Sequence, residues 1–181
     1  MNTPVALIPD YVTGTWSIDH VHSDVAFTVR HLGVAKVRGR FDAFEGQIVT
    51  AENPLESSVQ ATIQSSSIST GSGQRDDHIR TADFLDVENH PTLTFVSTGV
   101  RSDGEAYLLD GELTIRGITK PVTLNLEING FGTGFDGKPV VGFSATTEVN
   151  RSDFEITAGP AGAIVGEKVK ITLEVEANKQ D

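Results

Sequence analysis

The alternation of apolar and polar residues across positions 24–46 constrains the fold of this chain most strongly. Successive side chains of a β-strand point to opposite faces, so alternation with a period of two indicates a strand with one buried face. After a turn at Gly33 the alternation returns over residues 35–41. The two apolar faces carry Val25, Phe27, Val29 and His31 on the first strand and Val37, Gly39 and Phe41 on the second. Two such strands need a shared core, which the rest of the chain must supply.

The same pattern recurs through most of the chain. It appears in residues 15–20, 44–48, 59–63, 93–95, 107–115, 122–128, 141–149 and 169–175. Regular hairpin spacing with one apolar face per strand is typical of an antiparallel barrel or sandwich. A barrel is favoured because closure removes exposed strand edges. We therefore predict an all-β fold, an antiparallel barrel of about eight strands with one short helix.

Local irregularities refine this prediction. The residues expected to point inwards are odd-numbered up to Phe41 and even-numbered from Phe44 onwards. This change predicts a bulge or bend near residues 42–43. Gly39, Gly46 and Gly111 fall on inward positions, where they could relieve curvature and are also expected to leave interior volume. The sequence Gly132-Thr-Gly-Phe-Asp-Gly137 matches a nucleotide-binding pattern only as text, because a strand rather than a helix follows it.

One helix is expected at residues 74–84. Ser72 can cap its N-terminus, and Asp76 and Asp77 lie in its first turn, where the helix dipole favours anions. The helix lies on a long polar connection. We expect it to plug or cover one end of the barrel, with Phe84 packed downwards.

Length and composition exclude several classes of protein. The 181 residues predict one domain at 14–178, a flexible N-terminal tail at 1–13 and a short C-terminal tail at 179–181. The chain has no cysteine, which excludes disulfides and zinc–thiolate sites. Its net charge of -11 argues against general binding to nucleic acid or anionic membranes. A signal peptide and an apolar run of about 20 residues are not evident, so we expect a cytoplasmic protein without stable membrane insertion.

The histidines are the main candidates for chemistry. His20 and His22 could share a strand face with Asp24 and bind a metal, but His22 is expected at a hairpin turn. We predict no metal and no cofactor. His20 and His31 share the parity of apolar residues and are expected to point towards the core or its rim. A structural role is favoured for His20, and His31 could instead contact a ligand head group.

Catalytic motifs are weak. No serine lies in a G-x-S-x-G elbow, and no nucleophile with a base and an orienting group can be read from the sequence. We therefore predict a protein that is not an enzyme. The alternatives are an enzyme that uses His20 or His31 on a small apolar substrate, and a solid-core interaction module.

A series of short motifs resembles the YceI-like family. They follow one another in order from about residue 14 to residue 176. The motifs are Ile18-Asp-His20, Val29-Arg-His-Leu-Gly33, Lys36-Val-Arg-Gly-Arg-Phe41, Arg75-Asp-Asp-His78, Ala82-Asp-Phe84, His90-Pro-Thr-Leu-Thr-Phe95, Gly111-Glu-Leu-Thr-Ile115, Gly117-Ile-Thr-Lys-Pro-Val122, Gly142-Phe-Ser-Ala145 and Asn150-Arg-Ser-Asp-Phe154.

The resemblance implies a lipocalin-like barrel that encloses a long apolar lipid, a polyisoprenoid such as an isoprenoid quinone or an isoprenyl phosphate. It also implies a homodimer, and many relatives are exported. After Phe154 the sequence departs from the family pattern, so the pocket wall formed by residues 155–166 is expected to differ.

We predict non-catalytic binding of such a lipid for transport, storage or sequestration. The residues expected to contact it are mostly apolar and share the inward parity of their strands: Trp16, Phe27, Val29, His31, Phe41, Phe44, Phe84, Phe95, Leu113, Leu124, Leu126, Phe143, Val169 and Ile171.

Overall fold

The computed structural model describes residues 8–104 and 106–181. The strands are β1 (Gly14–Ile18), β2 (Asp24–His31), β3 (Ala35–Phe41), β4 (Phe44–Thr50), β5 (Ser58–Gln64), β6 (Ile68–Ser69), β7 (Thr92–Asp103), β8 (Ala106–Ile115), β9 (Ile118–Thr133), β10 (Pro139–Asn150) and β11 (Val165–Lys179). One α-helix, α1 (Gly73–Ile79), follows β6. Short 3-10 helices occur at Pro54–Glu56, Ser65–Ser67, Arg151–Phe154 and Gly159–Ala163. Within the described residues no helix is long and apolar enough to cross a bilayer.

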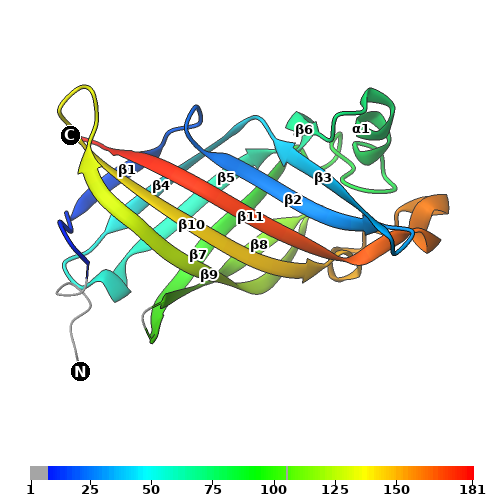
Figure 1. Ribbon diagram of the computed structural model, residues 1–181. Helices are drawn as coiled ribbons and strands as arrows, with labels where there is room; N and C mark the ends of the chain where they lie inside the picture. The colour runs from blue at the N-terminus through cyan, green and yellow to red at the C-terminus, as the bar shows by residue number, and fades with distance from the viewer. Residues whose placement is uncertain (1–7, 105) are drawn as a thin grey trace.

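The strands form a closed antiparallel barrel (Figure 1). Eight strands follow one another around it in the order β1-β4-β5-β7-β8-β9-β10-β11. The last strand pairs back with the first, with Trp16 opposite Lys179 and Ile18 opposite Ala177. This confirms the predicted all-β barrel, and the 132–137 segment turns between β9 and β10 as expected.

Three strands of the barrel are interrupted. β1 and β2 pair with β11 one after the other along its length, so together they occupy one strand position of the barrel. In the same way β4 and β3 share the next position, and β5 and β6 share the one after it. The expected break between Phe41 and Phe44 is therefore confirmed. The predicted hairpin turn at His22 is wrong, because residues 19–23 bend the chain without reversing it. The amide of Asp19 and the hydroxyl of Ser23 both donate to the carbonyl of Glu176 on β11, which holds the bend.

The interruption leaves one gap in the strand pairing. β6 pairs with β3, whereas β7 pairs with β5 and, within the described residues, not with β6. The connection to β7 closes this gap instead. The amide of Ser65 donates to the carbonyl of Pro91 over 2.9 Å, and its hydroxyl donates to the carbonyl of His90 over 2.8 Å.

The helix is shorter than predicted. Ser72 caps it as expected, with its hydroxyl accepting from the amide of Arg75. It ends at Ile79 rather than residue 84, because the following segment is held by tertiary contacts. Leu85 is buried in the core, and the carbonyl of Asp83 accepts from the amide of Ala158. In Figure 1, α1 and the β10–β11 connection lie at one end of the barrel, and the C-terminus lies at the other.

The core forms three clusters inside the barrel. At the end near the C-terminus, Trp16 is fully buried, and its indole nitrogen donates to Thr50 over 2.8 Å. At the α1 end, Phe154 is the most deeply buried residue of its cluster. A third cluster lies on β7, β8, β9 and β10 and consists of Phe95, Leu109, Leu124 and Ala145.

The inward glycines do not leave empty volume, so that reading of them is wrong. A Cβ on Gly39 would overlap the ring of Phe27, its cross-strand partner. A Cβ on Gly111 would overlap the ring of Phe95 and lie 2.8 Å from the carbonyl oxygen of Val96. The missing side chains let these aromatic rings lie against the barrel wall, so the volume is occupied by a neighbour.

Gly111→Ala is expected to lower the free energy of unfolding by about 1–3 kcal/mol, the usual cost of overpacking a core. The new methyl group would displace the Phe95 ring or strain the backbone of β7. Gly99→Ala is the matched control, because a Cβ there meets no atom within 4 Å. Chemical unfolding of both variants checks this. Equal stability of the two variants would contradict the packing described here.

The two predicted domain boundaries, between residues 13 and 14 and between residues 178 and 179, stay predictions. Residues 1–7 of the expected N-terminal tail lie outside the described residues, and Ile8 is buried. β11 runs to Lys179, one residue into the expected C-terminal tail.

Candidate functional site

The barrel encloses an apolar cavity of about 200 Å³. Thr147 and Arg151 are the only side chains with polar groups among its described lining residues. Every barrel strand contributes to the walls through its inward positions. The arrangement can hold an apolar group away from water and offers it few hydrogen-bonding partners.

Two further spaces share walls with the central cavity. A space of about 70 Å³ adjoins it across Val59, Leu109 and Phe143. A space of about 300 Å³, which we call the mouth cavity, adjoins it across Phe27 and Val169. The three spaces therefore follow one another through the interior. A flexible chain could occupy more than one of them if the dividing side chains move.

Most of the predicted contact residues line these spaces. The central cavity is lined by Phe27, Phe41, Phe44, Phe95, Leu113, Leu124, Phe143, Val169 and Ile171. Leu126 lines the smallest space, and Val29, His31 and Phe84 line the mouth cavity. Trp16 lines none of the three and belongs to the packed core. Ligand contact at each position stays a prediction.

Sequence reasoning missed other wall residues. The central cavity is also lined by Ile18, Val25, Ala26, Val59, Ala61, Ile63, Ile68, Leu93, Leu109, Ile115, Val122, Ala145, Val149, Phe154, Ile156, Leu173 and Val175. Most of these residues lie two or four positions from a predicted contact residue on the same strand and therefore point to the same face. The alternation of strand side chains could have identified them. Arg151 lies after the end of β10, where no alternation points to it.

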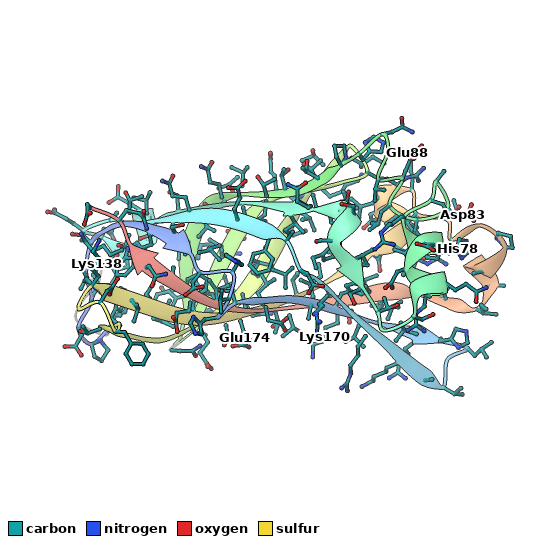
Figure 2. All side chains as sticks on the ribbon, turned by 90° about the horizontal axis from the view of Figure 1, so that it is seen from above. His78, Asp83, Glu88, Lys138, Lys170 and Glu174 are labelled. Atoms are coloured by element: carbon teal, nitrogen blue, oxygen red, sulfur yellow. The ribbon has the colours of Figure 1, made fainter. Side chains whose placement is uncertain are left out.

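Three segments build the mouth cavity: the β2–β3 hairpin, the β10–β11 connection and the α1 segment, by which we mean α1 and the residues that follow it as far as Phe84. Hydrogen bonds join them. The amide of Leu32 in the hairpin donates to the carbonyl of Ile164 over 2.8 Å, and the amide of Ala158 donates to the carbonyl of Asp83 over 2.9 Å. Figure 2 shows His78 and Asp83 close together at this end, opposite Lys138.

Some of the side chains of the α1 segment line the mouth cavity. The Nε2 atom of His78 lies 2.9 Å from a carboxylate oxygen of Asp83, and its ring meets the ring of Phe84 edge-on at 5.1 Å. Phe84 is half-buried and lines the mouth cavity. The α1 segment therefore forms one wall of the mouth, at the end where a covering helix was expected.

Arg151 organises the connection whose sequence departs from the family pattern. Its guanidinium donates to the backbone carbonyls of Ile156 (2.7 Å), Gly162 (3.0 Å), Val165 (3.2 Å) and Gly166 (3.1 Å). One side chain thus bonds four carbonyls, those of Ile156 and Gly162 in the connection and those of Val165 and Gly166 at the start of β11. Arg151 therefore ties together the backbone of this wall of the mouth cavity.

The histidines separate into different environments. His20 is exposed and lines none of the three interior spaces, so the prediction that it points towards the core or its rim is wrong. The reason is that β1 ends at Ile18, and His20 lies in the bend, where alternation no longer applies. His31 is half-buried and lines the mouth cavity, and within the described residues its ring makes no hydrogen bond.

A small polar cluster lies at the bend on the barrel surface. His22 Nδ1 lies 2.8 Å from a carboxylate oxygen of Asp19 and 3.6 Å from one of Glu176. The hydrogen bond with Asp19, reinforced by the charges of both carboxylates, raises the pKa of His22 above its usual value. These three residues could hold a cation. The His20 and Asp24 partners considered from the sequence are not part of this group.

Comparison with known proteins places the chain in a family. The family model for the YceI-like domain matches residues 16–177, which is nearly the whole chain. The chain belongs to the YceI-like family. A relative is the UPF0312 protein of Ectopseudomonas mendocina, which is 40% identical over 163 residues, a match that covers 88% of this chain and 83% of the relative.

Solved structures share the fold of this YceI-like protein. BcnA of Burkholderia cenocepacia superposes with a TM-score of 0.79 at 24% identity, over 88% of this chain and 98% of BcnA. A polyisoprenoid binding domain from Saccharophagus degradans superposes with a TM-score of 0.74 at 16% identity, over 93% of this chain and 100% of that domain. At these identities the likeness concerns the fold alone.

Proposed function

We propose that this YceI-like protein binds a long apolar lipid, a polyisoprenoid, inside its barrel and does not transform it. The observation that carries the proposal is the cavity of about 200 Å³ whose walls are apolar apart from Thr147 and Arg151. Burial of an apolar tail there contributes about 25 cal/mol per Å², less the cost of ordering the tail. The adjoining spaces give a long tail room beyond the central cavity.

The family supports this proposal. The structural neighbour from Saccharophagus degradans is described as a polyisoprenoid binding domain and shares the barrel fold. Roles in transport, storage or sequestration, a cytoplasmic location and a homodimer stay predictions from the sequence.

The alternative functions have less support. An enzyme using His20 is disfavoured because His20 is exposed outside the barrel. An enzyme using His31 would need a group that orients the imidazole, and no described residue hydrogen-bonds to this ring. A solid-core interaction module is disfavoured by the interior cavity.

Ala61→Phe tests the proposal directly. Ala61 lies on β5 and lines the central cavity, so a phenyl ring there should fill the space that the tail needs. We expect uptake of a fluorescent polyprenyl alcohol to weaken by at least about 10-fold, the equivalent of about 1.4 kcal/mol. Gln60→Phe is the matched control, since Gln60 is the preceding residue and is exposed. Melting of both variants confirms that they fold. Unchanged uptake by a folded Ala61→Phe protein would refute binding in the central cavity.

A further inference from the structure

The tip of the β2–β3 hairpin is apolar and faces the solvent. Residues 32–35 read Leu-Gly-Val-Ala and carry no polar side chain. Leu32 is 58% exposed and Val34 is 84% exposed. Neither residue lines one of the three interior spaces, so the cavities do not account for them. In Figure 2 this hairpin, in blue, projects away from the body of the barrel.

The backbone of the turn makes these aliphatic side chains more unusual. Leu32 has a φ of 55° and Gly33 a φ of 70°. The amide of Val34 donates to the carbonyl of His31 over 3.2 Å across the turn. Hairpin turns with two consecutive positive φ values favour asparagine, aspartate and glycine, which adopt this conformation at little cost. A leucine here bears a conformational cost and exposes its side chain to water, which indicates that the side chain makes a contact.

Basic side chains flank the tip on the outer face of the barrel. Residues 25–41 contain no aspartate or glutamate. Lys36 and Arg38 are exposed on β3, and Lys170 is exposed on β11. Thr28 on β2 lies opposite both Arg38 and Lys170, so the two cations lie on the same face of the sheet. None of these three cations forms an ion pair with a described carboxylate.

The carboxylates beside this face do not cancel its charge. Three of them have partners of their own: Asp42 is paired with Arg40, Glu148 with Lys168, and Glu167 accepts from the amide of Ser152. The potential of exposed charges is screened over about 10 Å at an ionic strength of about 0.1 M. A surface that touches the tip therefore meets the local cations rather than the net charge of -11 of the whole chain.

We propose that the tip of the β2–β3 hairpin docks on an anionic phospholipid bilayer. Leu32 and Val34 enter the boundary between head groups and acyl chains, and the flanking cations contact the anionic head groups. A protein partner fits less well, because a stable protein interface takes about 20–30 residues from each side. A second copy of this chain would place like charges against one another. The docking does not depend on which lipid the barrel encloses.

The test measures binding to two kinds of vesicle by sedimentation. One kind contains equimolar phosphatidylglycerol and phosphatidylcholine, and the other contains phosphatidylcholine alone. We expect the protein to bind the anionic vesicles at least about 10-fold more tightly, since each lysine or arginine near such a surface strengthens binding several-fold. The variants Leu32→Asn/Val34→Ser and Lys36→Gln/Arg38→Gln should each weaken this binding by at least about 10-fold. Asparagine suits the left-handed backbone, so the tip variant should melt no lower than the wild-type protein.

Phe135→Ser is the matched control. Phe135 is fully exposed in the turn between β9 and β10, which lies beside the C-terminus at the opposite end of the barrel (Figure 1). This variant should bind anionic vesicles like the wild-type protein. The chain has no cysteine, so Val34→Cys and Phe135→Cys can each be labelled with an environment-sensitive dye. Only the dye at position 34 should shift to shorter wavelength on anionic vesicles.

Several results would overturn the proposal. Equal binding of the wild-type protein to the two kinds of vesicle would do so, and so would no binding to either. An equal dye shift at both positions would show that the protein adsorbs without using the tip. If the tip variant changes the oligomeric state of the protein without vesicles, the tip is a contact between copies instead.

Ala61→Phe separates docking from uptake into the barrel. The substitution fills the central cavity but leaves the tip unchanged, so this variant should bind anionic vesicles like the wild-type protein. Weaker vesicle binding by a folded Ala61→Phe protein would mean that the barrel extracts a phospholipid, and docking by the tip would be overturned. Failure of docking would leave the proposed lipid binding standing, because that proposal is tested by uptake of the polyprenyl alcohol.

Discussion

Trp16→Ala is expected to lower the free energy of unfolding by about 4 kcal/mol, near the top of the range for single substitutions in a core. The indole is fully buried, with a relative exposure of 0%, among Ile48, Val141 and Ala177. Its removal leaves a large void and deprives the Thr50 hydroxyl of the bond from the indole nitrogen. Denaturant unfolding followed by circular dichroism measures the loss.

Ser17→Ala is the control for this substitution, because Ser17 is the next residue of β1 and is exposed. It should change stability by no more than about 0.5 kcal/mol. Trp16 lines none of the three interior spaces, so the variant should bind lipid in proportion to its folded fraction. A Trp16→Ala protein of nearly wild-type stability would contradict the packing. A folded variant with much weaker lipid binding would indicate that Trp16 contacts the ligand.

Arg151→Met is expected to lower the free energy of unfolding by about 3 kcal/mol, since hydrogen bonds to charged groups contribute more than neutral ones. Methionine keeps much of the apolar stem but cannot donate to the four loop carbonyls. Part of the loss is recovered because water can reach some of these carbonyls. Amide hydrogen exchange should show loss of protection across residues 155–166 beyond the global change.

Lys168→Met is the matched control for Arg151. Lys168 lies nearby on β11, is exposed and pairs with Glu148 at 3.4 Å on the barrel surface. Its replacement should cost no more than about 0.5 kcal/mol and leave exchange in the loop unchanged. If Arg151→Met behaved like this control, the arginine would not set the shape of the wall.

The barrel and much of its interior could be predicted because strand alternation is a local property. The inward parity of β2 identified Phe27, and the parity of β8 identified Leu113, without any knowledge of the partner strands. The same rule did not distinguish packed from cavity-lining positions. Trp16 has inward parity and fills the core, because what surrounds a side chain depends on the opposite wall of the barrel.

The errors arose where tertiary contacts override local pattern. Gly111 offers no volume because the Phe95 ring of the neighbouring strand covers it, and sequence does not show which ring lies over which glycine. The turn expected at His22 is a bend, because β11 is long enough to pair with both β1 and β2. Arg151 was missed since its partners are backbone carbonyls, which have no sequence signature.

The unpaired edge between β6 and β7 determines where the barrel wall is weakest. Around the rest of the circumference, opening the wall means breaking a ladder of backbone hydrogen bonds, and these break cooperatively. Along this edge no ladder joins the described residues of β6 and β7, and Ser65 instead donates two hydrogen bonds to the carbonyls of His90 and Pro91. We therefore expect the wall to open along this edge before any of the paired strands separate, and to close again without any strand losing its register.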